Sequence, residues 1–138
     1  MLLDVNVLLS LAWPNHQFHG AARTWFARNS KRGWSTCAIT QLGFVRLSSN
    51  TSFTEEARSP GEAAALLSDL TGLRGHAYLA ELPPPTAFGE VWKGLFGHRQ
   101  TTDAYLACVA VHHGTKLVTF DRKLSSLPGI SKAVTVLE

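Results

Sequence analysis

The chain has few cysteines and no long hydrophobic run, and both absences limit what it can be. Its 138 residues include two cysteines, Cys37 and Cys108, and each lies in an apolar context. Such cysteines are typical of buried free thiols in a reducing compartment, and no Cys or His lies near them at the spacing of a zinc site. No apolar run approaches the roughly 20 residues that span a bilayer. The N-terminal run follows no basic stretch and is interrupted by Asp4, so we expect a cytoplasmic protein without a signal peptide.

Several common catalytic motifs are also missing. The sequence has no G-x-S-x-G nucleophile motif, no P-loop and no dinucleotide-binding fingerprint. The opening D-V-N is only superficially similar to the start of a haloacid-dehalogenase-like phosphatase, since the second aspartate of D-x-D is absent. Acidic residues are fewer than basic ones, which gives a net charge of +3 and a pI near 9.1. An acidic partner such as RNA is compatible with this balance, although many basic proteins bind no nucleic acid.

Short apolar runs alternate with segments of helical spacing. With 45% hydrophobic and 17% charged residues the chain can bury a core, and its length fits one domain over residues 1–138. We expect strands over residues 1–4, 34–39, 76–82, 116–120 and 133–137. We expect helices through residue 11 and over residues 16–30, 40–49, 60–73, 86–96 and 101–113. This alternation predicts an α/β fold, a single three-layer α/β/α sandwich around a mostly parallel five-stranded sheet whose strands are buried on both faces.

Three of the four aspartates, Asp4, Asp103 and Asp121, lie at expected ends of strands or helices. Asp4 ends the first strand, Asp121 follows the fourth, and Asp103 lies near the start of the helix that precedes the fourth strand. In parallel sheets, sites form at the carboxyl ends of the strands, so we expect these carboxylates at one edge. Mg²⁺ and Mn²⁺ prefer oxygen ligands, and a metal held by carboxylates can activate water and stabilise charge on a phosphodiester.

Each aspartate also has a simpler explanation. Asp4 can cap the first helix. Asp103 can be a favourable charge in the first turn of a helix that Thr101 or Thr102 caps. Asp121 can cap a turn. Taken singly, a cap is the more common role for each residue. Clustering of like charges is costly without a cation, however, so convergence of all three favours a metal site.

Motifs in a specific order carry a family resemblance. D-V-N follows the first strand, G-F-V-R lies in the helix after the second, T-D-A-Y-L opens a late helix, and T-F-D ends the fourth strand. This order and spacing, over essentially the whole length, resemble the PIN domains, and more narrowly the VapC-type toxins of toxin–antitoxin pairs. The resemblance implies a Mg²⁺- or Mn²⁺-dependent ribonuclease with the three aspartates as metal ligands. It also implies that Asn6, Thr102 and Thr119 support them through hydrogen bonds.

One position departs from the family pattern. PIN domains usually have a fourth acid in a stretch resembling T-E-x-G-F-V-R, whereas this chain reads T-Q-L-G-F-V-R, with Gln41 in place of the glutamate. A glutamine offers a carbonyl oxygen but no charge. At ~4 Å a pair of charges interacts by about 4 kcal/mol at an effective dielectric near 20, so metal affinity should fall. We keep Gln41 among the candidate catalytic residues and expect one metal ion, or a second that binds weakly.

Arg46 and Arg99 are candidates for contacts with phosphate or RNA. Arg46 can bind a phosphate bidentately if its helix directs it to the site, but an arginine at the surface or paired with an acid is equally common. Arg99 and His98 lie in the loop before the late helix, where most such residues are merely solvated. His16 and His19 have the spacing of a metal pair, but a helix surface is the more common place for them.

Together these features predict a metal-dependent endoribonuclease, the toxin of a VapBC-like pair, that hydrolyses structured RNA such as tRNA or rRNA. The resemblance further implies a homodimer and a tight complex with a VapB-like antitoxin whose tail lies in a groove beside the site. Trp13, Phe18, Trp25 and Phe26 are candidates for that groove or for the core. The alternative is a catalytically impaired PIN-fold protein, weakened by Gln41, that acts mainly by binding antitoxin or RNA. A phosphatase or DNA nuclease at the same metal site is disfavoured because its motifs are absent.

Overall fold

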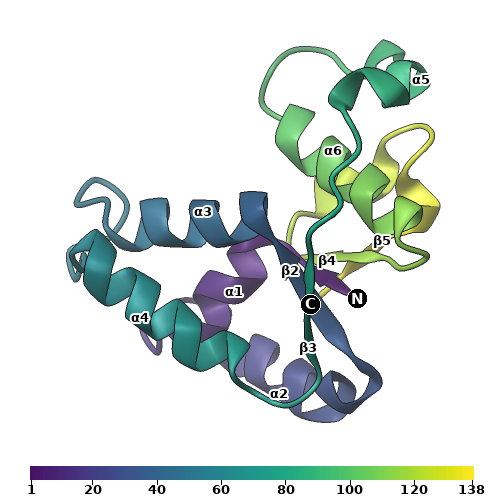
Figure 1. Ribbon diagram of the computed structural model, residues 1–138. Coiled ribbons are helices and arrows are strands. Elements are labelled where there is room, and N and C mark those ends of the chain that lie inside the picture. Colours follow the sequence, from purple (N-terminus) through teal and green to yellow (C-terminus); the bar gives the residue numbers. More distant parts are fainter.

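The computed structural model describes residues 1–138 and contains one sheet of five parallel strands (Figure 1). The strands are β1 (Leu2–Leu3), β2 (Trp34–Cys37), β3 (His76–Leu79), β4 (Leu117–Thr119) and β5 (Val134–Val136). The α-helices are α1 (Val5–Ala12), α2 (His19–Asn29), α3 (Ala38–Ser48), α4 (Pro60–Thr71), α5 (Gly89–Lys93) and α6 (Thr101–His112). Short 3₁₀ turns are η1 (Ser30–Arg32), η2 (Pro85–Phe88), η3 (Arg122–Ser126) and η4 (Ser131–Ala133). The expected α/β class and five-stranded parallel sheet are confirmed.

The order of the strands fixes where a site can form. The order is β3-β2-β1-β4-β5, so β1 is central. The chain moves outward from β1 to β2 and β3, and then returns through α6 to β4 on the other side of β1. In open parallel sheets, ligands bind at such a reversal, outside the carboxyl ends of the strands. Asp4 directly follows β1 and Asp121 closely follows β4, so both lie at this reversal.

Two hydrophobic clusters cover the two faces of the sheet. Leu2 belongs to the cluster that includes most of α6, and Leu3 to the cluster that joins α1, α3 and α4. Neighbouring residues of a strand point to opposite faces, so this two-residue strand contributes to both cores. Figure 1 shows α1 to α4 on one side of the strands and α5 and α6 on the other. The expected three layers are therefore present.

The second strand is shorter than expected because α3 begins early. Thr40 Oγ1 accepts a hydrogen bond from the backbone N–H of Cys37 at 3.0 Å and so caps the start of the helix. Ala38 and Ile39, expected in the strand, are instead the first residues of α3. This early start brings Ile39 close to the first turn of α6.

The third strand is not buried on both faces, contrary to expectation. β3 pairs only with β2, and Tyr78 is 52% exposed. It ends at Leu79, ahead of the three consecutive prolines, and the helix expected over residues 86–96 is divided into η2 and α5. An edge strand has only one neighbour, so its side chains are less covered than those of the central strands. None of the helices has the length and apolar character that a membrane-spanning helix requires.

Candidate active site

Asp4 is the buried acid at the centre of the carboxyl edge of the sheet, with 4% of its surface exposed. Its Oδ1 accepts a hydrogen bond from the backbone N–H of Val5 at 2.7 Å, which caps α1. The cap accounts for only one carboxylate oxygen. Oδ2 accepts a hydrogen bond from Thr119 Oγ1 at 2.7 Å, which links the ends of β1 and β4. Asp4 therefore both caps α1 and lies in the candidate site.

Thr119 is the centre of the hydrogen-bond network that holds Asp4. It is fully buried, and besides donating to Asp4 it accepts hydrogen bonds from Asn6 Nδ2 and from the backbone N–H of Asp121, both at 3.0 Å. Asn6 Oδ1 in turn accepts from the backbone N–H of Phe120 at 3.2 Å. Asn6 and Thr119 thus orient the carboxylate of Asp4 and the loop that carries Asp121.

Asp103 and Asp121 flank Asp4 from two further elements. Asp121 Oδ1 accepts a hydrogen bond from the backbone N–H of Lys123 at 2.9 Å, so Asp121 does cap the turn η3. Asp103 lies in the first turn of α6. The expectation that a threonine caps this helix is wrong, because the N-cap is Gln100, without a side-chain hydrogen bond, and the helix already includes Thr101.

The three carboxylates are close enough to repel one another. Burial, followed by the charges of Asp4 and Asp121, raises the pKa of Asp103 from 3.8 to about 7. Burial also raises the pKa of Asp4, and the charge of Asp121 adds to this rise, while hydrogen bonds from Thr119 and Val5 oppose it. Like charges held together in this way disfavour ionisation unless a cation compensates them.

No cationic side chain of the protein compensates this charge. Its two ion pairs join Lys93 to Glu90 and His112 to Glu81, and neither includes an aspartate. The oxygen-only donor set is the kind that Mg²⁺ or Mn²⁺ prefers. No three acidic, histidine or cysteine side chains are arranged to hold one ion directly. Mg²⁺ is commonly bound through one or two carboxylates and several waters, so these residues fit an ion bound partly through water.

Gln41 is hydrogen-bonded to β2 and not to any of the three carboxylates. Its Nε2 donates to Thr36 Oγ1 at 2.9 Å, and the same oxygen lies 2.8 Å from His76 Nε2. Gln41 lines a surface hollow between α3 and α4 that also includes Leu67 and Tyr78. It makes no hydrogen bond with Asp4, whose side-chain partners, Val5 and Thr119, are on α1 and β4. Sequence patterns did not indicate this link from Gln41 to Thr36 on β2 and from Thr36 to His76 on β3, because it depends on how the strands pair.

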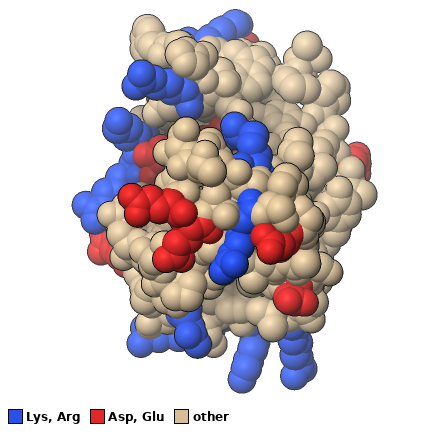
Figure 2. Space-filling model, turned by 90° about the vertical axis from the view of Figure 1, so that its left-hand side faces the viewer, with Lys and Arg blue, Asp and Glu red and all other residues tan.

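The remaining candidates are spread over different surfaces. Thr102 is exposed and makes no hydrogen bond to an aspartate, while Arg46 is exposed in the last turn of α3. Arg99 lines a hollow that also contains Asp121. His16 Nδ1 accepts from the Phe18 backbone N–H, and so requires no metal. On the face drawn in Figure 2, Lys and Arg gather along the upper left and lower edges and acidic side chains lie between them, so no continuous basic surface covers that face.

The four aromatic candidates for the groove or the core are mostly packed in the core. Trp13 is only 8% exposed and donates its indole N–H to Ser48 Oγ at 3.0 Å. Trp25 and Phe26 are half-buried against the cluster of α1. Phe18 alone is exposed, and its ring stacks on that of Phe120 with centroids 4.5 Å apart.

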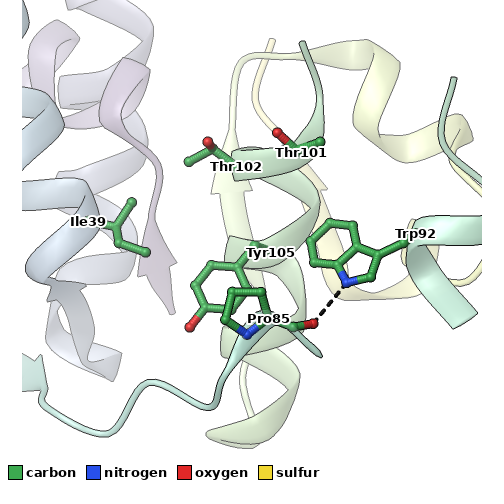
Figure 3. Close-up of a pocket in the computed structure, with 6 residues that line it drawn as sticks. All are labelled: Ile39, Pro85, Trp92, Thr101, Thr102 and Tyr105. Carbon is green, nitrogen blue, oxygen red and sulfur yellow. Dashed lines mark hydrogen bonds between the residues drawn. The ribbon is translucent and has the colours of Figure 1, made fainter. Parts of the chain in front are cut away.

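An apolar hollow of about 590 Å³ lies instead between the first turns of α3 and α6. It is lined by Ile39, Pro85, Trp92, Thr101, Thr102 and Tyr105 (Figure 3). The indole N–H of Trp92 donates to the carbonyl oxygen of Pro85 at 2.8 Å, and the Tyr105 hydroxyl donates to the carbonyl oxygen of Pro83 at 2.6 Å. These bonds fix two aromatic rings of the wall. Thr102, which lines this hollow, directly precedes Asp103 in α6.

The chain is similar to known proteins over most of its length. The PIN domain model matches residues 1–130. Ribonuclease VapC39 of Mycobacterium tuberculosis is 42% identical over 126 residues, which are 90% of each chain. Ribonuclease VapC44 of the same organism is 39% identical over 134 residues, 95% of this chain and 94% of that one. The fold is also similar to a chain in the crystal structure of VapBC2 from Rickettsia felis bound to a promoter DNA fragment, with a TM-score of 0.68, 14% identity and coverage of 99% and 98%.

A parallel α/β sheet with acids gathered at its central reversal thus defines the class of the protein. The chain belongs to the PIN-domain family and, within it, to the VapC type.

Proposed function

We propose that this protein is a Mg²⁺- or Mn²⁺-dependent endoribonuclease and the toxin of a VapBC-like toxin–antitoxin pair. The observation that carries the proposal is the cluster of Asp4, Asp103 and Asp121, which has no balancing cation and lies where ligands bind in such sheets. The names of its relatives, ribonucleases of the VapC type, support RNA as the substrate. We further propose that residues 1–138 act as one PIN-like domain.

The roles proposed for the three aspartates depend on how many hydrogen bonds hold each carboxylate. The metal ion, when bound, would supply a Lewis acid for the phosphate and make water a better nucleophile. Asp4 would be the fixed ligand, because Thr119 and the start of α1 hold both of its oxygens. Asp103 and Asp121 would complete the site from α6 and from the β4 loop, directly or through water. Thr119 and Asn6 would position Asp4 and contact no substrate.

The surroundings of the site suggest its partners. We propose that a VapB-like antitoxin covers the apolar hollow between α3 and α6, because apolar side chains from a partner would fill it and block access to Asp103. The protein would act as a homodimer in the cytoplasm, where its two buried thiols, Cys37 and Cys108, remain reduced. The substrate would be a structured RNA such as tRNA or rRNA.

The decisive experiment uses purified protein, freed of antitoxin, with total cellular RNA and Mn²⁺ or Mg²⁺. New discrete RNA ends are expected with the wild type and with Asp69→Asn, which alters an exposed aspartate on α4 outside the site. They should be absent with Asp4→Asn and in EDTA. Cleavage that persists in EDTA, or in folded Asp4→Asn protein, would disprove the proposed mechanism.

The impaired binding protein remains the second candidate, and one observation favours it. Gln41 supplies no charge and is engaged with Thr36 rather than with the aspartates. Expression without antitoxin separates the two functions. A working toxin arrests growth and Asp4→Asn relieves the arrest, whereas an impaired protein leaves growth unchanged in both forms.

A further inference from the structure

Phe96 is the most exposed large hydrophobic residue of the protein. Its side chain is 99% exposed, and the next, Leu42, is 69% exposed. Burying an aromatic ring on folding is favourable, so a ring held entirely in water suggests that it serves another molecule. The position of this ring relative to the acidic site makes it informative.

The residues before and after Phe96 are anchored to the protein, and they leave its side chain in solvent. Leu95 packs against the core cluster of α6, and Gly94 lies against Pro128. After the ring, Gly97 adopts a positive φ of 95°, and the His98 carbonyl oxygen accepts a hydrogen bond from Thr101 Oγ1 at 2.8 Å. The anchored residues on either side leave Phe96 at the tip of a loop that is tied to the start of α6.

Phe96 lines a hollow of about 520 Å³ together with Gly97, His98, Arg99, Gln100, Asp121 and Lys123. Asp121 is one of the three clustered carboxylates, so the hollow continues from the acidic site. Neither Arg99 nor Lys123 takes part in an ion pair of the structure. One wall therefore combines an aromatic ring with two uncompensated positive charges, and another wall is a carboxylate of the proposed metal site.

This combination fits one ligand chemistry. Proteins bind single-stranded nucleic acid by stacking bases on aromatic rings and by contacting phosphates with Lys and Arg. The apolar hollow of Figure 3 has no such charges among its lining residues, so the two hollows suit different occupants. A paired base already stacks on its neighbours within the helix, and only an unpaired base presents a free face.

We propose that this hollow holds an unpaired nucleotide of the RNA beside the bond that is cut, with its base stacked on Phe96 and its phosphates contacted by Arg99 and Lys123. The proposal rests on the proposed function and adds Phe96, Arg99 and Lys123 as the residues that hold the nucleotide beside the bond that is cut. A duplex would be bound poorly and would not be cut at its paired positions.

Fluorescence anisotropy of the antitoxin-free protein in EDTA tests this, with a labelled single-stranded RNA of mixed sequence and the same strand annealed to its complement. Phe96→Ala should weaken binding of the single strand by roughly tenfold or more, the effect of losing one base–aromatic stack. Phe96→Trp should retain it. Phe53→Ala removes another exposed phenylalanine, in the loop between α3 and α4, and should change nothing.

The charged residues give a second measurement. For single strands, each lost phosphate contact reduces the salt dependence of binding by about 0.7 in the slope of log K against log salt. Arg99→Gln and Lys123→Gln should each lower the slope by about this amount. Arg28→Gln, on the exposed surface of α2, should not.

The outcomes separate this proposal from the function on which it rests. If the wild type cleaves RNA but Phe96→Ala binds and cleaves as the wild type does, the nucleotide site is wrong and the nuclease stands. Equal affinity for duplex and single strand would also overturn it, as would a variant that changes only the oligomeric state or antitoxin binding. If the wild type cleaves nothing yet Phe96→Ala weakens binding of the single strand, the nuclease fails and the nucleotide site stands.

Discussion

Asp4 and Gln41 both follow strands that end at the same edge of the sheet, yet only Asp4 is hydrogen-bonded within the acidic site. Asp4 directly follows β1, and both of its oxygens are hydrogen-bonded at the boundary of β1 and β4. Gln41 lies one turn into α3 and is bonded to Thr36 on the other side of β1. The direction of a residue at a strand end is set by the sheet, whereas that of a residue within a helix depends on how the helix is rotated.

The packing of α3 sets that rotation. Gly43 lies against Val5, and a Cβ at position 43 would be 2.7 Å from Val5 Cγ2. Phe44 is fully buried beside it. With this face of α3 turned toward α1, Gln41 faces β2 and α4. A buried threonine accepts a hydrogen bond from an amide side chain in each region: Thr119 from Asn6 beside Asp4, and Thr36 from Gln41. Replacing each threonine therefore tests the two regions in parallel.

The largest effect is expected from Thr119→Val, compared with Thr36→Val. The first change removes the donor to Asp4 and the acceptor for Asn6 and for the Asp121 backbone. We expect a loss of about 2–4 kcal/mol in the free energy of unfolding, since buried groups left without partners cost roughly 1–3 kcal/mol each. Thr36→Val should cost about 1 kcal/mol because its partners are half-exposed. Urea denaturation measures the free energy of unfolding of both variants. Equal losses would contradict the larger role given to Thr119.

Gly43→Ala should destabilise the protein by about 1–3 kcal/mol, the usual cost of overpacking. The clashing atom belongs to Val5, a β-branched residue that has little freedom to rotate away. Thermal unfolding measures the change. The double variant with Val5→Ala should recover part of the loss, and an unchanged loss in that variant would show that the clash is not the cause.

Asp103→Asn should stabilise the metal-free protein. Folding raises the pKa of Asp103 from 3.8 to about 7, so the folded state binds this proton more tightly than the unfolded state. The resulting penalty is absent below 3.8 and complete above about 7. After allowance for the solvent-exposed part of the group, removing the charge should gain about 1–2 kcal/mol at pH 8.

Thermal unfolding in EDTA measures this gain, which should shrink at pH 4. Asp69→Asn is the matched control and should change stability little at either pH. Mn²⁺ should stabilise the wild type more than Asp103→Asn, because a bound cation relieves the same repulsion. If Asp103→Asn is less stable than the wild type at pH 8, then burial and the charges of Asp4 and Asp121 do not raise the pKa of Asp103 as described.

Gln41→Glu should have the smallest effect. A carboxylate there adds a charge near the sheet edge, so we expect Mn²⁺ to bind more tightly and cleavage to rise. Because the side chain is held on Thr36, the gain should be less than about tenfold, below the about 4 kcal/mol of a direct pair at ~4 Å. Calorimetric titration of Mn²⁺ measures it, beside Gln17→Glu in the loop before α2 as a control. No gain in either affinity or cleavage would mean that Gln41 is not what limits the site.

The sequence by itself determined the alternation of strands and helices, and with it the place of Asp4, Asp103 and Asp121 at the ends of elements. This was possible because period, turn residues and strand ends are local properties of a chain. The family resemblance, carried in part by the D-x-N and T-F-D motifs, also implied Asn6 and Thr119 as supports of the aspartates. The structure shows the hydrogen bonds between them and shows that Asp4 and Asp121 also act as caps.

Only the tertiary structure decided the rest. The exposed edge position of β3, the burial of Trp13, the rotation of Gln41 toward Thr36 and the isolation of Phe96 at a loop tip each depend on which elements pack against one another. The buried Trp13, for example, donates its hydrogen bond to Ser48, which lies 35 residues away in the chain, and no local pattern specifies such a contact. A sequence determines which residues can end a strand or begin a helix, and packing determines which of them meet.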